Sequence, residues 1–284
     1  MRWVRVKVDG VWRVGLLRGD AAQLLKPQDT DSWLTDLPAA QASATKGQSV
    51  QLEGLAVGAP VIRPSKILAI GLNYAAHAAE SVSFAAGAAP GIQKWFNKQT
   101  SALNGPFDPV HRPKVSHQLD YEGELVVIIG RAGRHVPAER AMEIVAGFSC
   151  GCDYSVRDWQ RASPTMIMGK GFDTHAPVGP YLVTPDEVGD WRDLSLTTRV
   201  NGEQRQRAKL GDMIASIAEQ IAHLTAAFTL WPGDLIFTGT PAGVAAGQNP
   251  PPWLVPGDTV SVAIEQIGQM QQTIIEEPET HRIG

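Results

Sequence analysis

The sequence is poor in cysteine, and this scarcity excludes several protein classes. Its 284 residues contain two cysteines, Cys150 and Cys152, which stand two positions apart. A disulfide between residues so close in sequence would be badly strained, which argues against a disulfide-stabilised secreted scaffold. A two-thiol metal or redox site stays open, but no second cysteine pair completes a zinc set. We expect reduced, buried structural thiols in a reducing compartment.

Long apolar runs and blocks of like charge are also lacking. No stretch approaches the roughly 18 apolar residues of a membrane-spanning helix, and the first ten residues alternate like a strand rather than resembling a signal peptide. The 25 basic and 29 acidic residues give a net charge of −4. This balance argues against nucleic-acid and membrane-surface partners and favours a small molecule. We therefore expect a cytoplasmic protein.

The composition changes along the chain and predicts two domains. Residues 1–63 should form a small N-terminal β-rich domain, and residues 64–284 a larger one. Residues 29–64 are rich in Ala, Gly, Ser and Gln, which predicts a connection into the second domain. We place the boundary near Arg63.

Strands dominate the expected secondary structure. The alternation of residues 3–17 about Asp9-Gly10 predicts a hairpin. Further strands are expected at residues 66–73, 124–130, 181–184, 194–202, 234–240 and 258–268. Helices are expected at residues 74–81, 138–147 and 211–228. In the last helix, a stripe with helical spacing should face the core: Ile214, Ile217, Ile221, Leu224 and Phe228. These elements predict an α+β fold that is mainly β.

Three carboxylates precede one of the most apolar strands. Asp120, Glu122 and Glu124 occupy alternate positions in "LDYEGELVVIIG", so in a strand they share one face. Spacing alone favours an exposed strand face, because such pairs are common on solvated strands. The alternative is a cluster of carboxylates at a functional site.

Seven segments of the sequence, taken in order, resemble one known family. They are "KILAIGLNYAAHAAE", "FNKQTSALNGPFDPV", "LDYEGELVVIIG", "CDYSVRDWQ", "GKGFDTHAPVGPYLVT", "VNGEQRQ" and "GDLIFTGTPAGV". Each is weak alone, but together they resemble the fumarylacetoacetate hydrolase family over residues 66–268, in its branch of acylpyruvate hydrolases and 2-oxo-hepta-ene-dioate isomerases. The resemblance implies a catalytic domain that is a β-roll or β-sandwich with a few helices, and a homodimer.

The resemblance also implies a metal site. Its carboxylate ligands fall on Glu122, Glu124 and Asp153, whereas Asp120 is not among them. Hard oxygen ligands suit Mg²⁺ or Mn²⁺, with Ca²⁺ as a possible substitute. Three protein carboxylates leave coordination positions for water and for a chelating 2-oxo acid.

A histidine and a glutamate three residues apart form a second candidate site. On a helix, Glu80 can accept a hydrogen bond from His77 and raise its basicity. Without context such a pair would be an ordinary surface contact, but the resemblance implies a dyad that activates water. The Gly- and Ala-rich residues 84–91 follow directly and could act as a lid.

Further candidates are basic or polar. Lys170 resembles the family lysine that stabilises negative charge on the substrate, with a surface lysine as the alternative. Arg157 and Gln160 match substrate-contacting positions, or form a helical surface pair. Thr240 and, more weakly, Lys98 are candidates for the substrate carboxylate. His175 stands where many relatives carry an apolar residue, and either lines the pocket or is an ordinary hydrogen-bonded histidine.

These residues together predict a divalent-metal-dependent hydrolase. It would cleave a carbon–carbon bond in an acylpyruvate-type 2,4-dioxo acid, giving pyruvate or a related 2-oxo acid and a carboxylic acid. Oxaloacetate decarboxylation, or isomerisation or hydration of 2-oxo diacids, would use the same electron sink and stays open. Two non-catalytic alternatives are a metal-binding relative of the family and a calcium-stabilised β-sandwich module.

Overall fold

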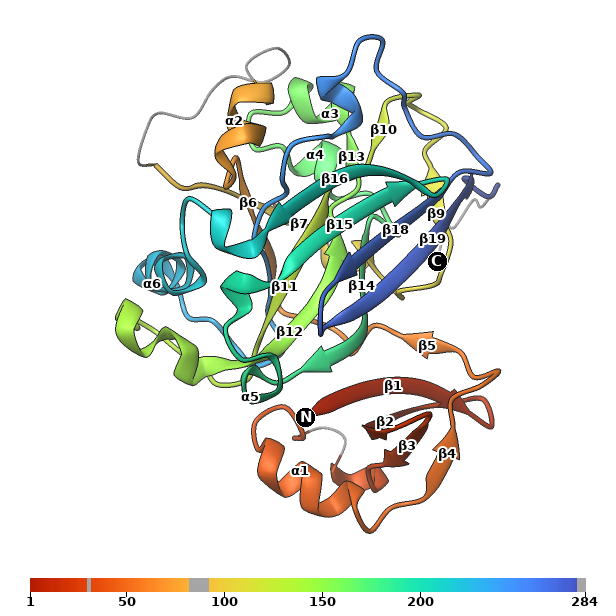
Figure 1. The fold of residues 1–284 in the computed structure, drawn as a ribbon, viewed down its shortest axis with the longest axis vertical. Helices are drawn as coiled ribbons and strands as arrows, with labels where there is room; N and C mark the ends of the chain where they lie inside the picture. The colour runs from red at the N-terminus through yellow and green to blue at the C-terminus, as the bar shows by residue number, and fades with distance from the viewer. Residues whose placement is uncertain (30–31, 82–91, 280–284) are drawn as a thin grey trace.

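Two large β-sheets build most of the protein (Figure 1). The computed structural model describes residues 1–29, 32–81 and 92–279. In these ranges a 12-stranded sheet runs β4 (Ser49–Gln51), β3 (Ala21–Leu24), β2 (Val11–Arg18), β1 (Arg2–Val8), β14 (Ala176–Val183), β12 (Val145–Cys152), β11 (Gly123–Ile129), β17 (Leu235–Phe237), β6 (Ile67–Gly71) and β7 (Lys94–Lys98), with β5 (Val57–Gly58) on β1 and β8 (Leu103–Asn104) on β14.

The second sheet covers one face of the first. Its five strands run β16 (Glu203–Lys209), β15 (Ser195–Val200), β18 (Thr259–Ile264), β19 (Gly268–Glu276) and β9 (Val110–Arg112), and β10 (Leu119–Asp120) pairs separately with β13 (Ser155–Val156). The helices are α1 (Leu37–Ala44), α2 (Ala75–Ser81), α3 (Arg157–Ala162), α4 (Ile167–Lys170), α5 (Pro185–Val188) and α6 (Ile217–Ala227), and the 3-10 helices are η1 (Pro27–Asp29), η2 (Thr100–Ala102), η3 (Ala138–Ile144), η4 (Trp191–Asp193), η5 (Leu210–Asp212) and η6 (Ala245–Gly247). The mainly β fold with several sheets confirms the predicted class.

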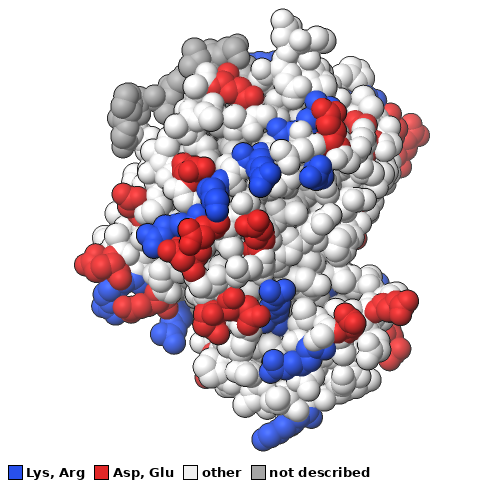
Figure 2. Space-filling model, in the orientation of Figure 1, with Lys and Arg blue, Asp and Glu red and all other residues white. Residues whose placement is uncertain are grey.

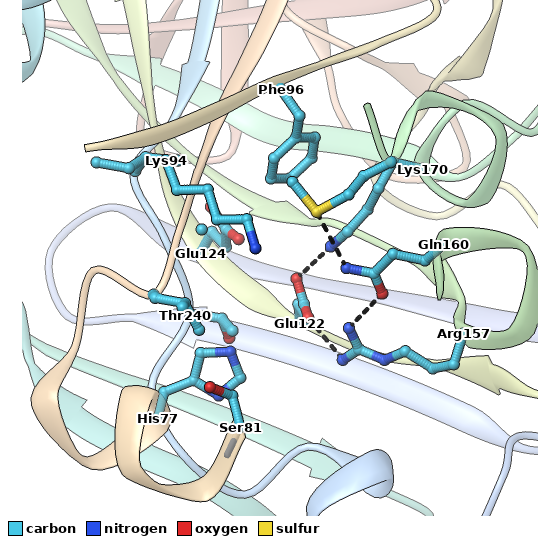
Figure 3. Close-up of a pocket in the computed structure, with 14 residues that line it drawn as sticks. His77, Ser81, Lys94, Phe96, Glu122, Glu124, Arg157, Gln160, Lys170 and Thr240 are labelled. Atoms are coloured by element: carbon cyan, nitrogen blue, oxygen red, sulfur yellow. Dashed lines mark hydrogen bonds and ion pairs between the residues drawn. The ribbon is translucent and has the colours of Figure 1, made fainter. Parts of the chain in front are cut away.

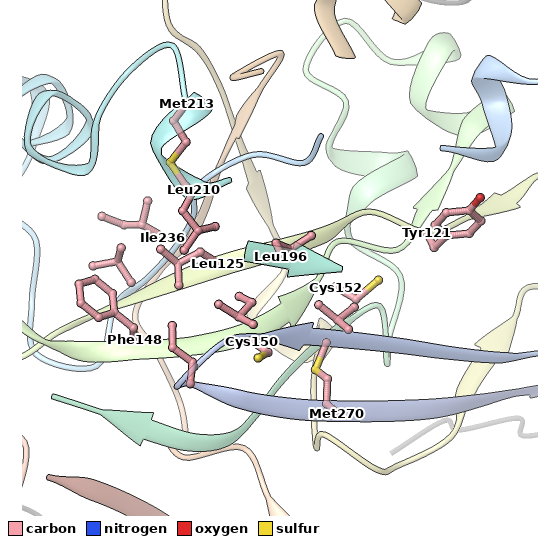
Figure 4. Close-up of a cluster of buried hydrophobic side chains, with 14 of the residues drawn as sticks. Tyr121, Leu125, Phe148, Cys150, Cys152, Leu196, Leu210, Met213, Ile236 and Met270 are labelled. Carbon is pink, nitrogen blue, oxygen red and sulfur yellow. The ribbon is translucent and has the colours of Figure 1, made fainter. Parts of the chain in front are cut away.

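Strand β11 is buried on both faces, and this explains its continuous apolar run. Leu125 and Val127 face the five-stranded sheet, whereas Val126 and Ile128 face the opposite core. Figure 4 shows the core between the two sheets, to which Phe148 of β12 and Leu196 of β15 both contribute. Burying each such side chain stabilises the fold by roughly 1.5–3 kcal/mol, so the start of β11 is held firmly in place.

The N-terminal strands form a hairpin, as their alternation predicts. Asp9 and Gly10 turn the chain between β1 and β2 with φ angles of 49° and 79°, which a tight two-residue turn requires. β1 pairs in turn with β14, where Arg2 lies opposite Val183, so these strands extend the large sheet. The boundary that we predict near Arg63 falls in the connection between β5 and β6.

The connection that we predict at residues 29–64 contains regular elements that its composition does not indicate. The connection contains α1 and the short strands β4 and β5. Asp36 caps α1 by accepting a hydrogen bond from the backbone N–H of Ala39. The helix buries only two small side chains, Ala40 and Ala44, so it lacks the apolar stripe by which helices are recognised.

Two predicted helices differ in their limits. Residues 138–144 form the 3-10 helix η3, and β12 begins at Val145. Helix α6 begins only at Ile217, because Ser216 and Glu219 form a capping box there. Ile217, Ile221 and Leu224 are buried as predicted, but Ile214 precedes the helix and Phe228 follows it, and they are 59% and 37% exposed.

Charged side chains of both signs are mixed on the face that Figure 2 shows. Among the described residues, no helix has the length and apolarity needed to cross a membrane. Cys150 and Cys152 are free and buried, as their spacing predicts, and burial raises the pKa of both thiols.

Candidate functional site

A pocket opens beside the ends of β6, β7 and β11 (Figure 3). Helix α2 forms one wall, and α3 with α4 forms another. The residues that line it are Ile70, Gly71, Leu72, His77, Ser81, Lys94, Phe96, Glu122, Glu124, Arg157, Gln160, Met166, Lys170 and Thr240.

The three predicted ligands lie close together, and two of them, Glu122 and Glu124, line this pocket. Glu122 and Glu124 stand at the start of β11, and Asp153 follows β12. Pairing of Gly123 with Cys152 brings these ends together, and the Asp153 backbone N–H donates to the Glu122 carbonyl over 2.8 Å. One carboxylate oxygen of each residue lies within 4.8 Å of the others, and all three side chains are buried.

Buried cations compensate part of this negative charge. Lys170 Nζ lies 2.6 Å from Glu122 Oε2 and 2.8 Å from Asp153 Oδ2. Arg157 Nη2 lies 2.6 Å from Glu122 Oε1. Glu124 Oε2 accepts a 2.7 Å hydrogen bond from the Gly239 backbone N–H. Figure 3 shows Lys170 and Arg157 approaching Glu122 from opposite sides.

The two glutamates differ in their proton affinity. Burial, followed by the nearby charges of Asp153 and Glu122, raises the pKa of Glu124 well above its ordinary value. Burial also opposes ionisation of Glu122, but Arg157 and Lys170 outweigh it and lower its pKa. Glu124 is costly to ionise because it is buried next to two other carboxylates. A divalent cation bound by oxygen ligands would remove this cost. Glu122, Glu124 and Asp153 thus form a candidate divalent-metal site.

His77 and Glu80 lie together on α2, at the edge of the same pocket. His77 Nδ1 is 3.2 Å from Glu80 Oε2. The Gly243 backbone N–H donates to both carboxylate oxygens of Glu80, over 3.1 and 3.2 Å. These bonds fix Glu80, and Glu80 in turn orients the His77 ring that lines the pocket.

Arg157 is tied down by carboxylates, which sequence reasoning did not foresee. Its Nε donates to Asp120 Oδ2 over 2.8 Å, its Nη2 meets Glu122, and its Nη1 donates to Gln160 Oε1 over 2.9 Å. Asp120 also accepts the backbone N–H groups of Ala245 and Ala246, over 2.8 and 3.0 Å. The side chain of Arg157 therefore holds Glu122 in position, and its predicted substrate contact stays a prediction.

Lys98 lies beneath the pocket. It is buried, and its ammonium donates to Asp153 Oδ1 and to the backbone oxygens of Tyr154 and Lys170. An ammonium has three donors, so these bonds use all of them. This geometry favours a supporting role for Lys98 over the predicted substrate contact.

Thr240 and His175 are both held by hydrogen bonds. The Thr240 hydroxyl donates to the Gly123 carbonyl over 2.9 Å and accepts from Gln206 Nε2 over 2.8 Å. Thr240 lines the pocket, and its contact with a substrate stays a prediction. The His175 ring is buried against the His111 carbonyl, 2.8 Å from its Nε2, and burial lowers the pKa of His175 to about 3. His175 is therefore an ordinary hydrogen-bonded histidine and does not line the pocket.

Several residues of the site were not predicted from the sequence. Lys94, Phe96 and Met166 line the pocket without belonging to a recognised site pattern. Asp120 did carry a signal, since it shares the alternation of Glu122 and Glu124, but its partners lie far away in the sequence. The predicted lid at residues 84–91 lies outside the described residues.

Known proteins are similar to this chain in sequence and in fold. Residues 66–275 match the family model described as fumarylacetoacetate (FAA) hydrolase C-terminal. The mitochondrial oxaloacetate tautomerase FAHD2A of Bos taurus is 41% identical over 219 residues, which cover 76% of this chain and 68% of that protein. The 2,4-didehydro-3-deoxy-L-rhamnonate hydrolase of Sphingomonas sp. (strain SKA58) is 39% identical over 283 residues, covering 97% and 96%.

A solved structure agrees along nearly the whole chain. The crystal structure of maleylpyruvate hydrolase from Sphingobium sp. SYK-6, in complex with manganese(II) ion and pyruvate, has a TM-score of 0.79 and 32% identity, and covers 98% of this chain and 100% of that one. The chain belongs to the fumarylacetoacetate hydrolase family of enzymes.

Proposed function

We propose that the protein is a divalent-metal-dependent hydrolase of acylpyruvate-type 2,4-dioxo acids. The observation that carries this proposal is that His77, which Glu80 contacts, and the carboxylates Glu122 and Glu124 line one pocket. A hydrolase needs both an activated water and a means of stabilising the carbanion that leaves. The hydrolase that resembles this chain over 97% of its length supports the same choice.

Glu122, Glu124 and Asp153 would hold Mg²⁺ or Mn²⁺, with Ca²⁺ as a substitute, and the relative crystallised with manganese(II) and pyruvate favours such an ion. The bound ion would supply Lewis acidity toward the oxygens of a 2-oxo acid. Lys170 and Arg157 both contact Glu122 and offset part of the negative charge of the site.

His77 would take a proton from water, and Glu80 would hold the imidazole in the orientation that this transfer requires. The resulting hydroxide adds to the distal carbonyl carbon of the substrate. The bond between C3 and C4 then breaks, its electron pair passes to C3, and the pyruvate fragment leaves as an enolate. The Lys170 ammonium stabilises this negative charge. Protonation at C3 returns one proton and gives pyruvate and a carboxylic acid.

A second activity is favoured by a separate observation. The relatives that are 41% identical over 76% of the chain are oxaloacetate tautomerases. Moving a proton between C3 and the 2-oxo oxygen needs the same stabilised enolate but no attacking water. We therefore keep enolisation, and with it decarboxylation or isomerisation of 2-oxo diacids, as the alternative. The homodimer and the cytoplasmic location stay predictions.

Product analysis by proton NMR tests the choice. The Mg²⁺-loaded protein is incubated separately with acetylpyruvate and with oxaloacetate, and each reaction has a chelator control. Acetate and pyruvate from acetylpyruvate support hydrolysis. Faster keto–enol exchange or pyruvate from oxaloacetate alone replaces it with the alternative activity, and no change in either contradicts both.

A further inference from the structure

The backbone between two of the candidate metal ligands needs a hydrogen-bond partner from outside its own sheet. Gly123 separates Glu122 from Glu124 at the start of β11, and β12 pairs with it on one side. On the other side, β17 pairs with β11 further along, at Val126–Ile128. A buried backbone N–H is costly without a partner, so the Gly123 N–H requires an acceptor from another part of the chain.

The side-chain amide of Gln206 supplies this acceptor. Gln206 lies on β16, at the edge of the five-stranded sheet, and is 1% exposed. Its Oε1 accepts the Gly123 N–H over 3.0 Å. Its Nε2 donates to Thr240 Oγ1 over 2.8 Å and to the Pro241 carbonyl over 2.7 Å. The Thr240 hydroxyl donates in turn to the Gly123 carbonyl, so Gln206, Thr240 and Gly123 form a closed ring of hydrogen bonds.

The partners of the Gln206 amide fix its orientation. The Gly123 N–H can only donate and the Pro241 carbonyl can only accept, so the amide oxygen faces Gly123 and the amide nitrogen faces Pro241. The same nitrogen donates to Thr240, whose own hydroxyl proton is then directed to the Gly123 carbonyl. Exchanging the oxygen and nitrogen of the amide would set donor against donor and acceptor against acceptor. The ring therefore has a single arrangement.

The ring holds both peptide groups that join the two glutamates. The Gly123 N–H belongs to the peptide between Glu122 and Gly123, and the Gly123 carbonyl belongs to the peptide between Gly123 and Glu124. Glycine restricts its own φ and ψ angles less than any other residue, so hydrogen bonds decide how these two peptides are turned. The Glu122 and Glu124 side chains are attached next to them, and the separation of their carboxylates therefore depends on the ring.

Close packing excludes a side chain at Gly123. A Cβ atom there would lie 2.0 Å from Thr198 Oγ1, and Thr198 pairs with Gln206 between β15 and β16. The peptides of Gly123 therefore lie directly against the five-stranded sheet, at the point where Gln206 reaches them.

The same part of β16 also contacts the loop behind the His77–Glu80 pair. The Gly243 N–H of this loop donates to Glu80, and the Arg205 carbonyl packs against Gly243. The hydrogen bond from Gln206 to Pro241 holds the loop two residues earlier. One edge of the five-stranded sheet thus supports both the ligand strand and the loop that orients Glu80.

We propose that Gln206 is a positioning residue that sets the separation of Glu122 and Glu124 for metal binding, through the two peptides of Gly123. Gln206 itself does not line the pocket. This proposal rests on the proposed function for the identity of the site, but metal binding can be measured without turnover. It also gives a role to the segment "VNGEQRQ", whose last residue is Gln206.

Isothermal titration calorimetry with Mn²⁺ tests this role. Gln206→Met keeps an unbranched side chain of similar length and removes all three hydrogen bonds. The affinity for Mn²⁺ should fall by ~10–100-fold, as it does for other groups that hold metal ligands in place. The electron paramagnetic resonance spectrum of the bound Mn²⁺ should also change, because the two carboxylates no longer keep the same geometry. Unchanged affinity and an unchanged spectrum would overturn the proposal.

A second buried glutamine provides the matched control. Gln220 of α6 is buried, its Nε2 donates to the Ala215 carbonyl over 2.9 Å, and it does not line the pocket. Gln220→Met removes a buried amide in the same way and should lower the melting temperature, but it should leave Mn²⁺ affinity and the Mn²⁺ spectrum unchanged. If Gln220→Met weakens Mn²⁺ binding as much as Gln206→Met, the loss reflects general stability and the proposal falls.

A double-mutant cycle tests whether the ring acts as a unit. Thr240→Val replaces the hydroxyl with a methyl group of similar size. Since Gln206 and Thr240 both hold Gly123, the loss of Mn²⁺ affinity in the double variant should be smaller than the product of the two single losses. Losses that multiply would show that the two residues act separately, which contradicts the ring.

Product analysis keeps this proposal apart from the proposed function. If Mn²⁺ binding depends on Gln206 but the wild type does not hydrolyse acetylpyruvate, the hydrolase assignment falls and this proposal stands. If the wild type hydrolyses acetylpyruvate and Gln206→Met binds Mn²⁺ as the wild type does, this proposal falls alone. A wild type that does not bind Mn²⁺ would overturn both.

Discussion

Asp120 accepts a 2.8 Å hydrogen bond from Arg157 Nε, and both side chains are buried beside the candidate metal site. Arg157 also contacts Glu122, and burial, which lowers its pKa, is outweighed by the charges of Glu122 and Asp120, so that its pKa is raised. The guanidinium thus depends on two carboxylates. Only Glu122 belongs to the predicted ligand set.

Replacing Asp120 should weaken the fold and the metal site together. Asp120→Asn leaves the buried Arg157 with Glu122 as its remaining anion. Removing one partner of a buried pair costs about 3–5 kcal/mol, and we expect the lower end because Glu122 remains. Urea denaturation measures this loss, and calorimetry should show weaker Mn²⁺ binding. Asp173→Asn, a matched change at an exposed residue, should alter neither, and an unchanged midpoint for Asp120→Asn would refute the structural role.

Glu124→Gln should abolish metal binding without harming the apoprotein. The substitution removes a ligand, so Mn²⁺ affinity should fall by more than the ~10–100-fold that an outer-shell change typically costs. It also removes a carboxylate that is unfavourable to ionise among its neighbours, so the melting temperature in EDTA should hold or rise. Mn²⁺ titration followed by electron paramagnetic resonance, together with calorimetric melting, measures both. Glu139→Gln, at an exposed glutamate, is the control. Tight Mn²⁺ binding by Glu124→Gln would end the ligand assignment.

The raised pKa of Glu124 predicts two pH effects of opposite sign. Without metal, the folded state keeps the Glu124 proton above pH 4.5, where the unfolded state has lost it, so this residue's contribution to stability falls as pH rises toward its folded pKa. Metal binding must expel the same proton, so affinity should increase with pH in that window. Glu122 has a lowered pKa, and its contribution is lost only on acidification below 4.5.

Calorimetry can count the proton directly. Mn²⁺ titrations in two buffers with different ionisation enthalpies should reveal proton release in the wild type, and melting in EDTA should show a pH slope that Glu124→Gln reduces. Identical binding enthalpies in both buffers would show that no proton is released, which would contradict a protonated Glu124 in the metal-free protein.

Variants of His77 and Glu80 should lose hydrolysis but keep the binding of metal and of a 2-oxo acid. His77→Gln and Glu80→Gln should each lower the rate of acylpyruvate hydrolysis, by ~10²–10⁴-fold for His77→Gln. Binding of Mn²⁺ and 2-oxoglutarate should persist, because neither residue is a predicted ligand. Exposed His117 provides the control substitution, His117→Gln. If hydrolysis survives in His77→Gln, water is activated by another group.

The sequence predicted those parts of the fold whose signals are local. The Asp9-Gly10 turn and the continuous apolar run of β11 follow from neighbouring residues alone. Helix α1 was missed because Ala40 and Ala44 leave no apolar stripe. Ile214 was assigned to the core because its spacing continues that of Ile217, although the cap at Ser216 starts the helix after it.

In the candidate site, too, the residues that lie in local sequence patterns could be predicted, and the contacts between distant residues could not. Glu122, Glu124, His77 and Glu80 lie in short sequence patterns that point to known chemistry. The first three line one pocket, and Glu80 contacts His77 beside it. The engagement of Arg157 by Asp120 could not be read from the sequence, because the partners are 37 residues apart and meet only through the pairing of β10 with β13. Lys98 shows the same limit, since its partner Asp153 lies 55 residues away.

One loop holds both halves of the site through its main chain. Gly243 supports Glu80, and the N–H groups of Ala245 and Ala246 support Asp120. A peptide group is the same whatever side chain it carries, so a saturation library at positions 245 and 246 should tolerate every residue that packs there, except proline. Position 243 should admit glycine alone, because a Cβ atom would lie 2.0 Å from the Arg205 carbonyl oxygen and φ is 108°. The support of Asp120 thus does not depend on the chemistry of the side chains at positions 245 and 246, where burial restricts only their size.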